Sequence, residues 1–148
     1  MVQYRAPWFS LDVLEPEAVD MIFSQAVLEH VEDLAGAYRA MRRWLKAGGL
    51  VSHQVDFRCH NTATCWNGHW TYSDRLWKVI RGKRPYLLNR QPHSTHVRLL
   101  AEEGFAGVIT TRADEKSSLK KSDLAPRFRE ILDGDLTTSD AFIQAVRA

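Results

Sequence analysis

The sequence predicts an α/β fold with a mostly parallel sheet, and three adjacent features support this prediction. Residues 19–23 are apolar apart from Asp20, which is typical of a central strand buried on both faces. Residues 32–46 then carry a helical pattern that ends before Gly48 and Gly49, the residue type that terminates helices. A second strand is expected over residues 50–57. Strand, helix, glycine turn and strand make one right-handed crossover unit.

The helix of this unit is defined by one face and by both ends. Glu32 and Asp33 stand at its start, where acids complement the free amides and the positive end of the helix dipole. Basic residues gather toward its other end, where cations are favoured. Its apolar residues recur at helical spacing and predict one buried stripe, made of Leu34, Ala37, Tyr38, Met41, Trp44 and Leu45.

Three stretches in this unit carry a resemblance to a known family. Val-Asp-Met-Ile-Phe-Ser, Val-Leu-Glu-His-Val and Leu-Lys-Ala-Gly-Gly together resemble the fourth and fifth strand region of class I methyltransferases, which use S-adenosylmethionine. The match is specific in combination and extends less sharply over most of the chain from about Val2. It implies a Rossmann-like fold in a single partial domain over residues 1–148, with an antiparallel last strand. It also implies S-adenosylmethionine as cofactor and a methyl acceptor that is a small molecule or is unknown, with sugars, lipids, small metabolites and proteins all left open.

The first part of the sequence lacks what that family uses to hold its cofactor. There, a glycine-rich turn follows the first strand, and an acidic residue ends the second. In this chain the first glycine is Gly36, inside the predicted helix. The resemblance therefore implies that the first two strands are absent and that residues 2–5 match the third. Trp8 and Phe9 would follow in a loop, either stacked on adenine or as an apolar plug.

A missing first strand has a physical consequence for the strand over residues 19–23. In the family the first strand lies beside the fourth, so its absence leaves an open, flat, apolar edge. Such an edge tends to pair with another chain. We therefore expect a homo-oligomer that assembles through this edge, or another element that covers it.

The predicted site lies just after residue 23, because ligands of open α/β sheets bind beyond the carboxyl ends of the strands. By resemblance, the methionine end of the cofactor is lined by Ser24, Gln25, Ala26 and Val27, with Glu29 on the same rim. His30 is the first candidate for a catalytic base, because imidazole titrates near neutral pH. The alternative is a structural histidine that orients the loop.

The end of the second strand offers a further set of polar residues. His53 lies within the strand and is interpreted as a packed core histidine. Asp56, Arg58, Cys59 and His60 follow at the carboxyl end of that strand, where the site is expected. His60 is the second candidate for a catalytic base.

An aromatic-rich insert over residues 57–93 follows. It forms either a lid over an organic substrate or a small satellite core, and its candidate substrate-binding residues are Trp66, His69, Trp70 and Tyr72. A short helix is expected over residues 74–81. A zinc site would need Cys59, His60, Cys65 and His69, but their spacing fits no known finger pattern, so no metal is predicted.

The remaining elements complete the predicted fold. A helix is expected to begin at Ser94 or Thr95 and to end at Gly104, followed by a strand over residues 107–113. Residues 124–132 are compatible with one more helix, with Pro126 in its first turn. Residues 141–146 are ambiguous by pattern, and the resemblance implies a last strand, inserted antiparallel beside the fifth.

Composition limits the classes of function. The formal net charge is only +2, which gives no indication of a nucleic-acid partner or of an anionic membrane. No apolar run approaches the ~20 residues that span a bilayer. Two cysteines make no disulfide framework, so a cytoplasmic location is expected. Three hypotheses remain: methyl transfer that is impaired in this chain alone, a degenerate methyltransferase-like binding module, and a metal-stabilised interaction module.

Overall fold

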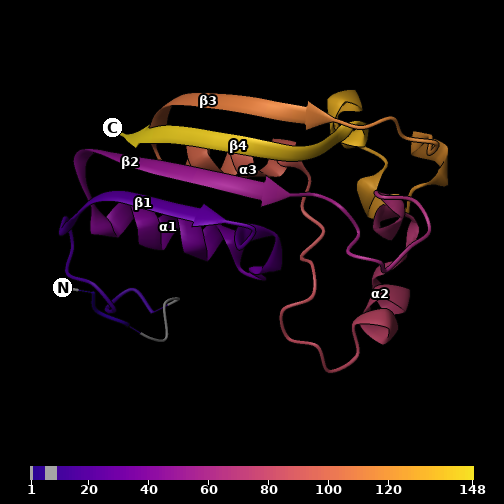
Figure 1. The fold of residues 1–148 in the computed structure, drawn as a ribbon, viewed down its shortest axis with the longest axis horizontal. Coiled ribbons are helices and arrows are strands. Elements are labelled where there is room, and N and C mark those ends of the chain that lie inside the picture. The colour runs from indigo at the N-terminus through magenta and orange to yellow at the C-terminus, as the bar shows by residue number, and fades with distance from the viewer. Residues whose placement is uncertain (1, 6–9) are drawn as a thin grey trace.

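The computed structural model describes residues 2–5 and 10–148. One four-stranded sheet, in the order β1-β2-β4-β3, carries the fold (Figure 1). Its strands are β1 (Val19–Gln25), β2 (Leu45–Asp56), β3 (Phe105–Asp114) and β4 (Thr138–Arg147), and the helices are α1 (Leu34–Trp44), α2 (Asp74–Arg81) and α3 (His93–Glu102). No helix within the described residues has the length and apolar character needed to cross a membrane.

The sheet is mostly antiparallel, so the expectation of a mostly parallel sheet is wrong. Only β1 and β2 pair in parallel, through the crossover helix α1. β4 enters between β2 and β3 and runs antiparallel to both of them. The insertion of this last strand removes the parallel contact that β2 and β3 would otherwise make. The expected antiparallel last strand beside the second strand of the unit is thereby confirmed, with His53 opposite Ile143.

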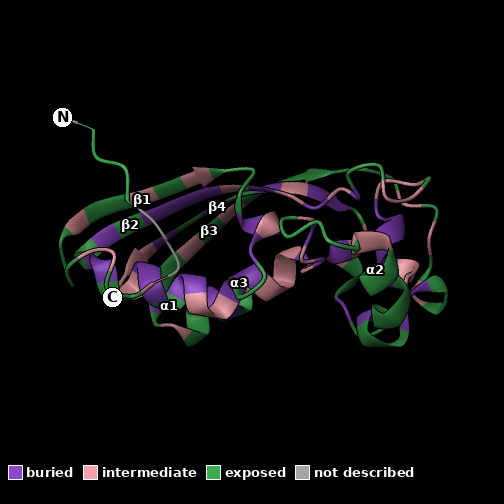
Figure 2. Ribbon diagram, turned by 90° about the horizontal axis from the view of Figure 1, so that it is seen from below, coloured by how far each residue is buried: buried purple, intermediate pink, exposed green. Residues whose placement is uncertain are grey.

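Helices α1 and α3 both lie on one face of the sheet (Figure 2). The main core lies between them and the strands, with Tyr38, Leu100 and Ile143 among its fully buried members. The other face of the sheet is open, and Phe23 of β1 is 76% exposed there. The expectation that this strand is buried on both faces is therefore wrong. Its outer edge is unpaired within the described residues, as the predicted open edge requires.

The crossover unit forms as predicted, but its helix ends earlier. Asp33 caps α1 by accepting a hydrogen bond from the Gly36 amide at 2.8 Å. The helix ends at Trp44, and Gly48 and Gly49 lie inside β2 instead of at the helix terminus. Gly48 has a φ of +76°, and the register between β1 and β2 shifts at this point. The two glycines therefore allow an irregular start of the strand.

A second, smaller core lies beyond the carboxyl end of the sheet. It is built from Trp70 with residues of the segment before β4, namely Leu124, Ala125, Phe128 and Ile131. The helix expected over residues 124–132 is replaced by a short 3-10 turn, Pro126–Phe128. The Ala125 amide donates to the Trp70 carbonyl oxygen instead of entering a helix. Residues 2–5 form no strand, contrary to expectation, and Trp8 and Phe9 lie outside the described residues.

Candidate functional site

The loop after β1 projects from the carboxyl edge of the sheet and is anchored to β2. The Ala26 amide donates to the Gln54 carbonyl oxygen at 3.0 Å, and the Ser24 hydroxyl is hydrogen-bonded to His53 Nδ1 at 2.8 Å. Val27 stays 43% exposed at the tip. The segment predicted to line the methionine end of the cofactor thus lies at the edge where ligands of such sheets bind.

The structure brings the two predicted catalytic bases together. The ring centroids of His30 and His60 lie 5.2 Å apart, although thirty positions separate them in the sequence. His60 Nε2 lies 3.2 Å from Asp56 Oδ2, and His30 Nε2 lies 4.0 Å from Glu29 Oε1. Burial lowers the pKa of His30, so its ring is neutral and able to accept a proton near neutral pH.

Glu29 is the most unusual member of this group. It is only 3% exposed, and neither carboxylate oxygen has a hydrogen-bond partner among the described residues. Burial raises the pKa of Glu29 to about 7, with the charges of Asp56 and Asp140 acting in the same direction. The sequence indicated only that Glu29 lies on the rim of the site, because neither its inward orientation nor its lack of partners has a local signal.

Two residues that the sequence analysis gave no role complete the site. Asn89 donates hydrogen bonds of 2.7 Å to the carbonyl oxygens of Leu28 and Val31, and so clamps the turn that holds Glu29. Arg90 borders the same small cavity as Glu29, and its guanidinium is 2.6 Å from Asp74. Both residues lie in the connection between α2 and α3.

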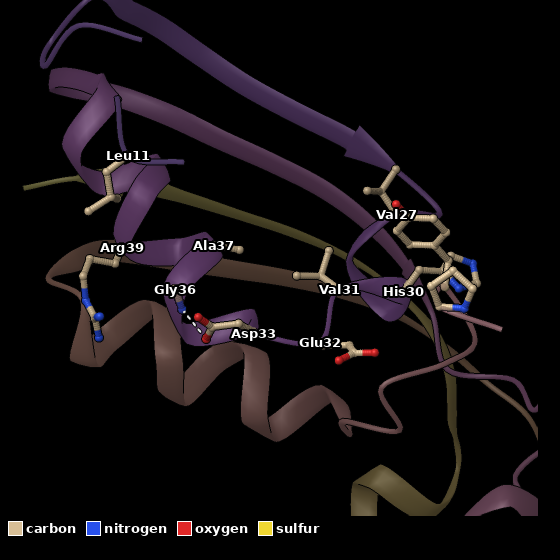
Figure 3. Close-up of a pocket in the computed structure, with 11 residues that line it drawn as sticks. Leu11, Val27, His30, Val31, Glu32, Asp33, Gly36, Ala37 and Arg39 are labelled. Atoms are coloured by element: carbon tan, nitrogen blue, oxygen red, sulfur yellow. Dashed lines mark hydrogen bonds between the residues drawn. The ribbon is translucent and has the colours of Figure 1, made fainter. Parts of the chain in front are cut away.

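A larger pocket of about 600 Å³ lies between the amino-terminal half of α1 and the loop that contains Tyr86 (Figure 3). Val27 and His30 lie at one end of this pocket, and Leu11 and Arg39 lie at the other. His30 therefore borders the pocket and also contacts the group around Glu29. An organic ligand in the pocket would have this imidazole beside it.

Backbone strain is concentrated in this region. Five non-glycine residues among those described have positive φ, and three of them, Ala26, His60 and Arg90, belong to the site. A positive φ is unfavourable for residues with a Cβ and persists only where the surrounding structure imposes it. Such strain is typical of functional sites and indicates that this geometry is held in place.

Comparison with known proteins agrees with this geometry. Residues 3–52, about a third of the chain, match a family model described as a methyltransferase domain. They cover the β1 loop, α1 and the first part of β2. Residues 3–52 are therefore similar to part of a methyltransferase domain. A search of curated proteins gives no match.

Solved methyltransferase structures share the fold of this chain at low sequence identity. A S-adenosylmethionine-dependent methyltransferase from Mesorhizobium loti has a TM-score of 0.56 and 18% identity, over 90% of this chain and 64% of that one. Phosphoethanolamine N-methyltransferase 2 from Haemonchus contortus gives 0.54 and 17%, over 90% and 34%. The CurJ carbon methyltransferase gives 0.51 and 19%, over 91% and 31%. The chain thus spans about one third to two thirds of the length of these structures.

The segment that the family resemblance assigns to the methionine end of S-adenosylmethionine is Ser24, Gln25, Ala26 and Val27. Its backbone is anchored at Ala26, and Val27 is exposed, so this segment would be available to one side of the cofactor. The glycine-rich turn that holds the rest of the cofactor in that family has no counterpart in this sequence, because no glycine precedes Gly36.

The aromatic insert over residues 57–93 contributes mainly to a satellite core. Trp70 is 1% exposed, and its ring packs against Trp66 and Phe128. The Tyr72 hydroxyl donates to the Thr62 carbonyl oxygen at 3.1 Å. His69 is buried beside the small cavity that Glu29 borders. Substrate contact by these residues stays a prediction.

The metal hypothesis finds no support in this part of the chain. Within residues 2–5 and 10–148, no three His, Cys, Asp or Glu side chains are grouped so that they could hold a metal ion. Cys59 is buried, and its thiol donates to the Ala63 carbonyl oxygen at 3.4 Å. Cys59 therefore has a structural contact of its own.

Proposed function

We propose that this chain forms the carboxyl-terminal part of a S-adenosylmethionine-dependent methyltransferase and contributes the methionine-facing loop and one wall of the acceptor site. The observation that carries the proposal is the position of Ser24 and Ala26. They lie in the segment that matches the family, and hydrogen bonds hold them at the carboxyl edge of the sheet. The glycine-rich turn would be supplied by another polypeptide segment.

S-adenosylmethionine, when bound, supplies a methyl group that its sulfonium already activates. The residues of this chain then have to position the acceptor and exclude water. His30 borders the larger pocket, and His60 stands beside it with Asp56 as its partner. Either imidazole can accept a proton from an acceptor that has to be deprotonated.

Titration with S-adenosylhomocysteine, followed by amide NMR spectra, tests the proposal. We expect chemical-shift changes at the amides of residues 24–30 and few changes elsewhere. Adenosine is the matched control, since it lacks the amino-acid end and should leave these amides unchanged. Equal shifts with both ligands would contradict the assignment of the loop to the methionine end. The competing hypothesis of a degenerate binding module predicts no shifts with either ligand.

A further inference from the structure

The small cavity beside Glu29 contains a carboxylate for which the structure provides no counterion. The side chain of Glu29 is 4% exposed, and Nε2 of the neutral His30 ring lies 4.0 Å from its Oε1, beyond hydrogen-bond distance. Neither of its oxygens has a hydrogen-bond partner within residues 2–5 and 10–148. A buried carboxylate without partners strongly destabilises a fold, so such groups are normally paired. Its presence here indicates that a partner comes from outside the chain.

Glu29 cannot easily turn away toward solvent. The Asn89 amide donates to the Glu29 carbonyl oxygen at 2.7 Å. The Asn89 side chain holds the carbonyl oxygens on either side of it, from Leu28 and Val31, also at 2.7 Å. Three hydrogen bonds from one residue therefore fix the backbone of this turn. The orientation of the carboxylate is imposed by the fold.

Two acids and two arginines border the cavity, and among the described residues Glu29 is the acid that has no arginine partner. Arg90 borders it, but its guanidinium pairs with Asp74 at 2.6 Å, and Arg58 pairs with Asp56 at 3.4 Å. No cation is left within the described ion pairs for Glu29. A ligand group that complements this environment has to be positively charged and has to donate hydrogen bonds.

The size of the cavity restricts this group further. Its volume of about 10 Å³ leaves room for about one water-sized group. A single ammonium nitrogen fits such a space, whereas a guanidinium or a quaternary ammonium does not. A primary ammonium also has three N–H donors, enough to serve both free oxygens of Glu29.

We propose that this cavity binds the primary amine of a ligand, as an ammonium ion paired with Glu29. The position of the cavity at the carboxyl end of β1, directly after the loop of Ser24 and Ala26, makes this ligand the methyl acceptor. That assignment as acceptor rests on the proposed function, whereas the ammonium site itself does not.

Ethylammonium chloride is the probe that tests the site, with the full chain labelled with ¹³C at the glutamate carboxyl groups. At about pH 8, above the pKa of Glu29, we expect its carboxyl resonance to shift with a dissociation constant of roughly 1 mM or weaker, as suits three non-hydrogen atoms. Glu29→Gln keeps the shape of the side chain and removes its charge. Because its own carboxyl signal is lost, binding to this variant is followed at the Asn89 side-chain amide, and we expect at least ~10-fold weaker binding.

Two controls make the result decisive. Glu130→Gln makes the same change at an exposed glutamate and should bind ethylammonium like the unaltered chain. Ethanol has the same size without the charge and should not bind measurably. Equal binding by Glu29→Gln, with its amide spectrum showing a folded chain, would overturn the proposal, as would equal binding of ethanol. Failure of the S-adenosylhomocysteine titration would refute the proposed function and leave the ammonium result unaffected.

Discussion

Acidification should destabilise this protein well above the pH at which carboxylates titrate, because three histidines are buried without charge. Burial lowers the pKa of His53 to about 4, and those of His69 and His96 to about 3. The unfolded chain has a histidine pKa of about 6.5. Below that pH the three histidines are protonated in the unfolded chain but stay neutral in the native state. The free energy of unfolding therefore falls as the pH falls.

The size of this loss follows from linkage. Between about pH 7.5 and about pH 5.5, each of the three histidines removes a little over ~1 kcal/mol, or about 4 kcal/mol together. Glu29 acts in the opposite direction, because its raised pKa makes the native state bind a proton in this range. The proton uptake by Glu29 offsets part of the effect of the three histidines, so the free energy of unfolding falls by roughly 2 to 3 kcal/mol. This is a large part of the 5–15 kcal/mol that is typical of a domain.

Urea unfolding followed by tryptophan fluorescence at a series of pH values measures this loss. Glu29→Gln provides the internal check, because it removes the opposing proton uptake and should make the pH dependence steeper. The same variant should be more stable than the unaltered chain at about pH 7.5, by roughly 1–2 kcal/mol, since it no longer buries a charge. A free energy of unfolding that stays constant or rises from about pH 7.5 to about pH 5.5 would refute the reasoning.

Three further predictions concern the site and the open sheet. Asn89→Ala removes two hydrogen bonds to the turn of Glu29, so thermal or urea unfolding should show a loss of about 2 kcal/mol; an unchanged midpoint would contradict the clamp. Ala26→Gly relieves a φ of +51° and should leave stability unchanged or raise it by up to ~1 kcal/mol, and a clear loss would count against strain at this position. Because the edge of β1 is open, light scattering should give a mass above that of the monomer. Phe23→Lys on β1 should reduce this mass, whereas Ile109→Lys on the opposite edge strand should not. A monomeric unaltered chain would rule out self-association.

The site shows how far local patterns extend. The run of residues 19–23 followed by polar residues located the loop, and the same reasoning placed His30 and His60 at the ends of two strands. Their 5.2 Å approach could not be derived, because it depends on the parallel register that sets Ser24 opposite His53. Side chains far apart in sequence meet only through such pairing, and no local period encodes it.

By itself, the sequence determined the strand–helix–strand unit, because apolar spacing and capping act within a few residues, as at Asp33 and Gly36. Only the tertiary structure decided that most strand pairs of the sheet are antiparallel, because this depends on the pairing of β4 with both β2 and β3. It also decided the inward position of Glu29, which depends on Asn89, sixty positions further along the chain. Burial and charge pairing result from the whole fold, and this is why the most unusual group of the site has no local signal.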